Sequence, residues 1–282
     1  MKGMLDKRFN KGITHLKLLI KRRVMEYNSL MKIFFVIMVL VLTIMVDGEI
    51  YARNFITSTE HDPVLIGQRS EIAIGKNTDQ QMRKTYRVLT DRKLNGQIDA
   101  IGRRLAALSK RNNLKYTFTV LDDKLVNAFA APGGYVYITT GILKRLKNEN
   151  EIAGVLGHEI GHVVHRHSLK ALQRQMIVSF GVQVVAAKLG DTGALSGALM
   201  LKASEISASL LLLKNSRVNE LQADSEGVKI MQLAGYNPQA MIDIQMMLLK
   251  QSKGNNPPAI ISTHPPSQER IDAIRKAIEK MK

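Results

Sequence analysis

The segment His158-Glu159-Ile160-Gly161-His162 has the residue types and the spacing of a catalytic metal site. On a helix, residues four positions apart lie one turn apart on the same face, so both imidazole rings can reach one metal ion. A glutamate directly after the first histidine lies beside that ion, where it can hold a water molecule and accept its proton. The segment therefore predicts metal-assisted hydrolysis, with His158 and His162 as zinc ligands and Glu159 as the general base.

A zinc ion in a hydrolytic site usually has three protein ligands and keeps one position open for water. Glu220 is the best candidate for the third ligand, and Asp224 follows it by one helical turn. Asp224 could accept a hydrogen bond from a ligand histidine and so hold its ring in place. Acidic residues four positions apart are also common on solvated helix faces. From spacing alone, the ligand role and a surface role of Glu220 are equally supported.

The residues around the motif predict a buried helix. Asn148 followed by Glu151 resembles a capping box at its start. Apolar side chains then lie on most sides of the segment, at Ile152, Val155, Leu156, Ile160, Val163 and Val164. Gly154, Gly157 and Gly161 are poor helix formers, each costing about 1 kcal/mol relative to Ala. They indicate tight packing against a neighbouring element, or room for metal and substrate, and the two are compatible.

Two β-rich segments precede this helix, Tyr116–Leu121 and Tyr135–Thr140, and a loop of small residues over Asn127–Gly134 lies between them. The second strand is a candidate edge on which an extended polypeptide substrate pairs by β-addition. Its residues in that role would be Val136, Tyr137, Ile138 and Thr139. The alternative is that this strand is ordinary sheet structure.

Helical spacing dominates the rest of the chain. The polar residues 53–96 predict a helical N-terminal extension, and Ser216–Leu233 predicts a helix that ends at Gly235. Two further helices are expected to begin at Asn237-Pro238 and near Ser267. We therefore expect one compact α+β domain that is mostly helical and contains a small sheet.

Composition narrows the possible functions. The chain has 282 residues and no cysteine, which excludes disulfides, thiolate zinc sites and cysteine nucleophiles. Its net charge of +17 could suggest a nucleic-acid partner. The first 32 residues, however, hold nine basic and two acidic side chains, and the remaining charge is scattered without an aromatic-basic cluster. We expect a solvated basic surface and no nucleic-acid partner.

The N-terminal segment predicts export. Residues 33–46 form an uncharged apolar run that is shorter than the ~20 residues of a membrane-spanning helix but suits the core of a signal peptide. Ala52 is a small residue suited to a cleavage site, and Met31 could be the true start. The alternative is an uncleaved anchor that attaches the protein to a membrane. We expect a basic leader over 1–52 and a peptidase domain over 53–282.

Four blocks, in order along the chain, give the sequence a family resemblance. It resembles the zinc metallopeptidases that include the prenyl-protein (CAAX) endopeptidase and the bacterial membrane heat-shock proteases. It is most similar to their exported bacterial branch, which includes periplasmic outer-membrane quality-control proteases, and to the related mitochondrial inner-membrane protease. The blocks are Val126–Thr139, Asn150–His162, Ser216–Asp224 and Thr263–Ile271.

The resemblance implies a zincin-like gluzincin fold with one Zn²⁺ per chain. It implies that His158, His162 and Glu220 bind zinc, that Glu159 is the general base and that Asp224 supports a ligand. It also gives His264 an active-site role, either as a fourth zinc ligand that silences the enzyme or as a donor to the oxyanion during turnover. His165 and His167 follow the motif and are expected to be exposed polar residues, as is Arg217.

The expected function is zinc-dependent endopeptidase cleavage of unfolded or misassembled polypeptides in extracytoplasmic protein quality control. The expected location is the periplasm or the outer face of the inner membrane. Some exported relatives carry a C-terminal helical-repeat domain; this sequence stops soon after its last predicted helix, so we do not expect docking to large assembly machinery. The rival interpretation is a zinc-stabilised chaperone or scaffold that holds polypeptides without cutting them. Glu159 argues against the rival, because a purely structural zinc site has no need of that carboxylate.

Overall fold

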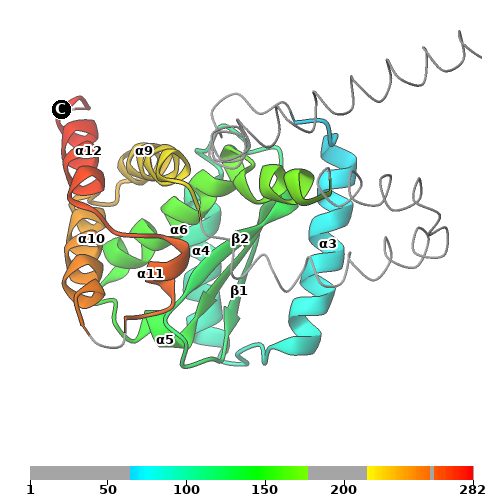
Figure 1. Cartoon of the computed structure of the whole chain (residues 1–282). Coiled ribbons are helices and arrows are strands. Elements are labelled where there is room, and N and C mark those ends of the chain that lie inside the picture. The colour runs from blue at the N-terminus through cyan, green and yellow to red at the C-terminus, as the bar shows by residue number, and fades with distance from the viewer. Residues whose placement is uncertain (1–63, 177–214, 255–256, 282) are drawn as a thin grey trace, which may run out of the picture. The chain divides into compact units, whose positions relative to one another are not determined.

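A three-stranded sheet separates two groups of helices in the computed structural model, which describes residues 64–176, 215–254 and 257–281 (Figure 1). The strands are β1 (Thr117–Leu121), β2 (Ala128–Ala131) and β3 (Tyr135–Thr139), in the spatial order β1-β3-β2. β3 runs parallel to β1 and antiparallel to β2.

Alternation along the strands gives the sheet two buried faces. On one face, Phe129 and Tyr137 stack and pack beside Met82 of helix α3 (Gln68–Thr85). On the other face, alanines of β2 and aliphatic residues of β3 join the main core with helix α4 (Arg92–Ala106). The predicted strand at Tyr116–Leu121 is confirmed, one residue shorter. The predicted N-terminal helical extension is confirmed for α3 and the start of α4, and its residues 53–63 lie outside the described part of the chain.

The interpretation of Val136–Thr139 as an edge strand is wrong. β3 lies between β1 and β2, so both of its edges already carry backbone hydrogen bonds. The loop expected over Asn127–Gly134 contains strand β2 instead, which pairs with β3 and places Ala128 and Ala130 in the main core. A tight turn then joins β2 to β3 through Gly133 and Gly134, whose φ angles of 77° and 94° suit glycine.

Helix α6 (Glu149–Val164) carries the metal motif across the core. The predicted cap is confirmed: the Asn148 side chain accepts a hydrogen bond from the Glu151 backbone N–H, and the Glu151 carboxylate accepts one from the Lys147 N–H. The helix ends at Val164, and two residues later Arg166 has a left-handed backbone conformation, with φ 56°. The chain then turns, and residues 167–176 are again helical.

Helix α9 (Arg217–Leu233) crosses α6 at very short range. A Cβ atom built on Gly161 would lie 2.6 Å from the Ala223 carbonyl oxygen, and one on Gly157 would lie 3.4 Å from that of Gly227. Glycine is therefore required for this crossing at Gly161, and the packing explanation of the motif glycines is correct there. The close crossing brings the residues of α9 to the metal motif.

The C-terminal helices pack against α6 and α9. They are α10 (Gln239–Ser252), the short α11 (Ile260–Thr263) and α12 (Gln268–Glu279). α12 begins next to Ser267, close to the predicted start, and the Ser267 side chain caps it; Gly235 follows α9 with a φ of 78°. Arg217 is on the surface, as expected, and forms an ion pair with Glu269 at 3.3 Å.

The described residues form a mostly helical α+β domain with a small sheet, as predicted. None of their helices has the length and apolar character needed to cross a membrane. Both the basic leader and the apolar run at residues 33–46 lie outside the described residues, so the division at residue 52 stays a prediction.

Candidate metal centre

Four buried side chains from three segments meet at one point. His158 and His162 come from α6, Glu220 from the first turn of α9, and His264 from the residue that ends α11. One potential ligand atom from each lies within 4.8 Å of the others. The sequence therefore predicted all four members, and the structure brings them together.

The nitrogen atoms of this cluster face one another as the ligands of one metal ion would. His158 Nδ1 lies 2.9 Å from the Asp224 carboxylate and must donate to it, which leaves a lone pair on Nε2 of the neutral ring. That Nε2 lies 3.0 Å from His162 Nε2 and 3.1 Å from His264 Nδ1. A single metal ion between the three rings would accept the lone pairs of all three nitrogens at once.

The separations also match zinc in size. Zinc binds histidine nitrogen and carboxylate oxygen at about 2.0–2.2 Å in a tetrahedron, so its ligand atoms lie about 3.3–3.5 Å apart. Both histidines of α6 lie 3.4 Å from the Glu220 oxygens. His264 Nδ1 lies 3.1 Å from Glu220 Oε1. The four residues are of the types that bind zinc, and their ligand atoms lie close enough together that they could hold one ion.

Charges around the cluster favour metal binding. Burial raises the pKa of Glu220, but His264, Arg270 and His158 outweigh it and hold that pKa well below its usual value. Burial lowers the pKa of His158, but Glu220 and Asp224 outweigh it and raise the pKa to about 10 in the metal-free chain. Zinc must therefore displace a proton from His158, so we expect its affinity to rise with pH.

Asp224 and Arg270 form a buried pair behind the ligands. The Arg270 guanidinium donates to both Asp224 oxygens at 2.7 and 2.8 Å and lies 2.6 Å from Glu220 Oε2. Burial raises the pKa of Asp224, but Arg270 outweighs it and keeps the carboxyl ionised. Asp224 is therefore placed as predicted, as the acceptor that orients His158. Arg270 was not predicted, although its block, Thr263–Ile271, was recognised.

Asp224→Ala should lower zinc affinity by about 10- to 100-fold, because it removes the acceptor that fixes the His158 ring. Competition with a chromophoric chelator measures this affinity. Asp243→Ala changes an exposed aspartate on α10 and is the matched control. Unchanged affinity in the folded Asp224→Ala chain would remove Asp224 from this role.

Glu159 lines the pocket beside the cluster and has one unpaired oxygen among the described residues. Its side chain is buried, and Oε2 has no hydrogen-bond partner among the described residues. Burial raises its pKa, while His264 and His158 lower it by less. A buried carboxylate with a raised pKa and an unused acceptor suits a general base. His264 Nε2 lies 3.6 Å from the other Glu159 oxygen, so the same histidine borders both the cluster and the candidate base.

His167 is buried, contrary to the expectation that it is exposed. Its Nδ1 lies 2.8 Å from His162 Nδ1, and its Nε2 lies 3.0 Å from Gln222 Oε1 of α9. Helical spacing alone placed it away from the metal; the turn at Arg166 brings it back. Burial lowers the pKa of His167 to about 3, so the ring is neutral. His165 is half-buried and stacks on the His167 ring.

The comparisons with known proteins agree with this geometry. Residues 92–278 match the sequence profile of peptidase family M48. The chain belongs to that family. Zinc is the metal of the M48 metalloproteases, and His158, His162, Glu220 and His264 are the group that fits it in this chain.

Several relatives are named as proteases. The chain is 30% identical to the beta-barrel assembly-enhancing protease of Yersinia pestis over 75% of its own length and 44% of the relative. It is 34% identical to the mitochondrial metalloendopeptidase OMA1 of Schizosaccharomyces pombe, over 64% of this chain and 51% of the relative. It is 31% identical to the metalloprotease YcaL of Escherichia coli, over 63% of this chain and 70% of the relative. The chain spans less than half the length of the beta-barrel assembly-enhancing proteases.

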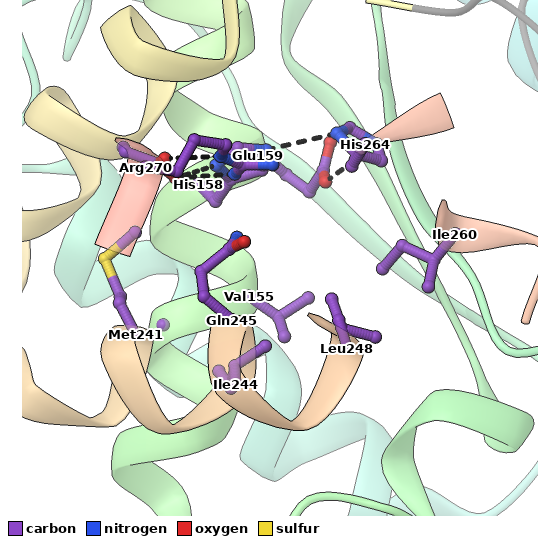
Figure 2. Close-up of a pocket in the computed structure, with 12 residues that line it drawn as sticks. Val155, His158, Glu159, Met241, Ile244, Gln245, Leu248, Ile260, His264 and Arg270 are labelled. Carbon is purple, nitrogen blue, oxygen red and sulfur yellow. Dashed lines mark hydrogen bonds and ion pairs between the residues drawn. The ribbon is translucent and has the colours of Figure 1, made fainter. Parts of the chain in front are cut away.

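An apolar pocket adjoins the M48 site, and its lining comes from several elements. Figure 2 shows His158, Glu159, His264 and Arg270 at the polar end and aliphatic side chains at the other. The apolar part is lined by Val155, Met241, Ile244, Leu248 and Ile260. Gly154 also lines the pocket, and a Cβ atom there would lie 3.1 Å from Ile244 Cδ1, so this glycine allows α10 to pack closely against α6. Gln245 borders the pocket with an oxygen that has no partner among the described residues.

Proposed function

We propose that this M48 chain is a zinc-dependent endopeptidase that cleaves unfolded or misassembled polypeptides in extracytoplasmic protein quality control. The observation that carries the proposal is the unused Glu159 oxygen beside a cluster built for a metal. Bound zinc would lower the pKa of a coordinated water to about 7 and polarise the scissile carbonyl. Glu159 would hold that water, accept its proton and pass it to the leaving amine.

An unfolded substrate needs a strand edge on which to lie. β3 is paired on both sides, so among the described strands the outer edge that lies closest to α6 belongs to β2. The Ser168 hydroxyl donates to the Ala130 carbonyl at 2.6 Å and pins this strand beside the end of the metal helix. We therefore assign substrate pairing to β2 rather than to Val136–Thr139. The apolar pocket next to Glu159 suits an apolar substrate side chain near the cleaved bond.

The test is digestion of one protein in its folded and its permanently unfolded form. The purified chain should cut the unfolded form at internal bonds, and removal of zinc with a chelator should stop the reaction. Binding without any cleavage, at full zinc occupancy, would instead support the chaperone or scaffold interpretation.

We also propose that the chain is exported, on the basis of the basic flank and the apolar run within residues 1–52. The name of the Yersinia relative, a beta-barrel assembly-enhancing protease, supports a place in the cell envelope. Residues 33–46 would be either the core of a removed signal or a short anchor.

His264 is proposed to close the site. Its Nδ1 lies 3.1 Å from both His158 Nε2 and Glu220 Oε1, so it would be a fourth protein ligand to a zinc ion held there and would take the position that the hydrolytic water needs. Pro265 and Pro266 follow it and stiffen the loop that holds it there. The loop would have to move before substrate is cut.

His264→Ala should therefore raise peptidase activity at saturating zinc, because it opens the fourth position. A continuous assay with a quenched peptide measures this change. Lower activity would support the alternative, that His264 donates to the oxyanion. Equal activity and equal zinc affinity would contradict both roles.

A further inference from the structure

His167 connects His162, a predicted zinc ligand on α6, to helix α9. Its buried ring lies between His162 of α6 and Gln222 of α9, at 2.8 and 3.0 Å. We propose that His167 is a positioning residue for the metal, which holds the His162 imidazole with its Nε2 directed at the zinc ion. The proposal rests on the proposed zinc-binding role of His162.

The direction of each hydrogen bond between Gln222, His167 and His162 can be worked out by starting from Gln222. The Gln222 carbonyl oxygen can only accept, so His167 Nε2 carries the hydrogen. A neutral His167 then has a lone pair on Nδ1, which can only accept from His162 Nδ1–H. His162 with hydrogen on Nδ1 has its lone pair on Nε2, the atom that faces His158 Nε2 and Glu220. These two hydrogen bonds, from His167 to Gln222 and from His162 to His167, form a relay. The relay fixes the one tautomer of His162 that binds metal through Nε2.

Each histidine of the metal motif thus has its own orienting partner. Asp224 receives the Nδ1 hydrogen of His158, and His167 receives that of His162. The partners differ in charge: a carboxylate supports His158, and a neutral ring supports His162. Both connections end on α9, at positions four and two residues after Glu220. One helix therefore provides a proposed ligand and anchors the rings of the other two.

The backbone is bent to bring His167 to this place. A left-handed conformation at a residue other than glycine costs about 1–3 kcal/mol and persists only where other contacts hold it. Arg166 has this conformation, and its Nε lies 3.5 Å from the buried Glu71 carboxylate. Glu71 also receives two hydrogen bonds from Arg111, which donates a third to the Val163 carbonyl at the end of α6. These contacts hold the turn that returns His167 beneath His162.

The experiment compares two replacements of His167 by their zinc affinity, measured by chelator competition. His167→Asn keeps a side-chain acceptor close to the position of Nδ1, whereas His167→Leu keeps apolar volume and no acceptor. A positioning role predicts that Leu weakens zinc binding about 10- to 100-fold and that Asn restores much of it. A role in packing alone predicts the reverse order, because a buried site tolerates Leu better than Asn.

Three controls make the result decisive. His165→Leu changes the neighbouring ring, which makes no hydrogen bond to a ligand, and should leave zinc affinity unchanged. The melting temperature of each metal-free variant reports folding separately from metal binding. If His167→Leu does not fold, Gln222→Leu tests the same relay at a half-buried position, with Gln222→Glu as the variant that keeps the acceptor.

Nitrogen-15 NMR of histidine-labelled, zinc-loaded Glu159→Gln protein gives a direct signature. His162 should carry its hydrogen on Nδ1 in the parent chain, and this signal should be lost or exchange-broadened in His167→Leu. Zinc affinity equal to the parent in folded His167→Leu and Gln222→Leu would overturn the proposal while leaving the zinc site intact. Failure of the parent chain to bind zinc would instead overturn the proposed function.

Discussion

Glu159→Gln should abolish peptide hydrolysis and leave zinc binding intact. The side chain keeps its size and one acceptor oxygen, but an amide cannot take a proton from water. General-base catalysis contributes about 10²- to 10⁴-fold, so the cleavage rate of the unfolded substrate should fall by at least this range. The Glu159 carboxylate is not among the four groups that converge on the metal position, so the zinc content should stay the same.

The matched comparison uses the proposed ligands. His158→Ala and Glu220→Ala should lose both zinc and cleavage, whereas Glu159→Gln should lose cleavage alone. Metal analysis and a discontinuous peptide assay on the same preparations measure the two properties. Full proteolysis by zinc-loaded Glu159→Gln would show that another group accepts the proton.

Arg270→Met should destabilise the chain strongly. Arg270 is 1% exposed, and its guanidinium compensates the buried carboxylates of Asp224 and Glu220. Burial lowers the pKa of Arg270, but Asp224 and Glu220 outweigh burial and raise it, so the guanidinium stays protonated. Removing one partner of a buried ion pair leaves uncompensated charge and costs about 3–5 kcal/mol.

Arg275→Met is the control for this prediction. Arg275 lies on the same helix, and its ion pair with Asp272 is half-exposed, so its loss should change the free energy of unfolding by less than about 1 kcal/mol. Urea denaturation of the metal-free proteins measures both values. A loss below about 1 kcal/mol for Arg270→Met would mean that Asp224 and Glu220 do not need this cation.

The two motif histidines were predictable from short-range spacing, whereas the ligand role of Glu220 came from the family resemblance, because spacing left a surface role equally supported. His158 and His162 are one helical turn apart, and Glu220 and Asp224 repeat this spacing on a second helix. His264 came from the family resemblance, because no helical period connects a loop residue to a motif a hundred positions earlier. The cap at Asn148 was also predictable, since side chain and backbone partners are three residues apart.

Long-range packing decided the rest. β3 was taken for an edge because Asn127–Gly134 reads as a loop of small residues, yet Ala128–Ala131 pairs with it in the space beside α6. His167 was misplaced because helical periodicity was continued past Val164, where the left-handed Arg166 breaks it. An arginine followed by a histidine just after a helix end gives no local signal for such a turn. Arg270 lies in a block that resembles the family, but no role could be assigned to it from the sequence. Its burial depends on two acidic residues more than forty positions away.

The most direct test of the zinc-peptidase account is a titration of the metal-free chain with zinc, followed by cleavage of an unfolded protein. The account predicts that activity returns in proportion to zinc and is complete at one equivalent per chain, and that Glu220→Ala shows no return over the same range. Cleavage that persists in the metal-free chain, or that zinc does not restore, would contradict it.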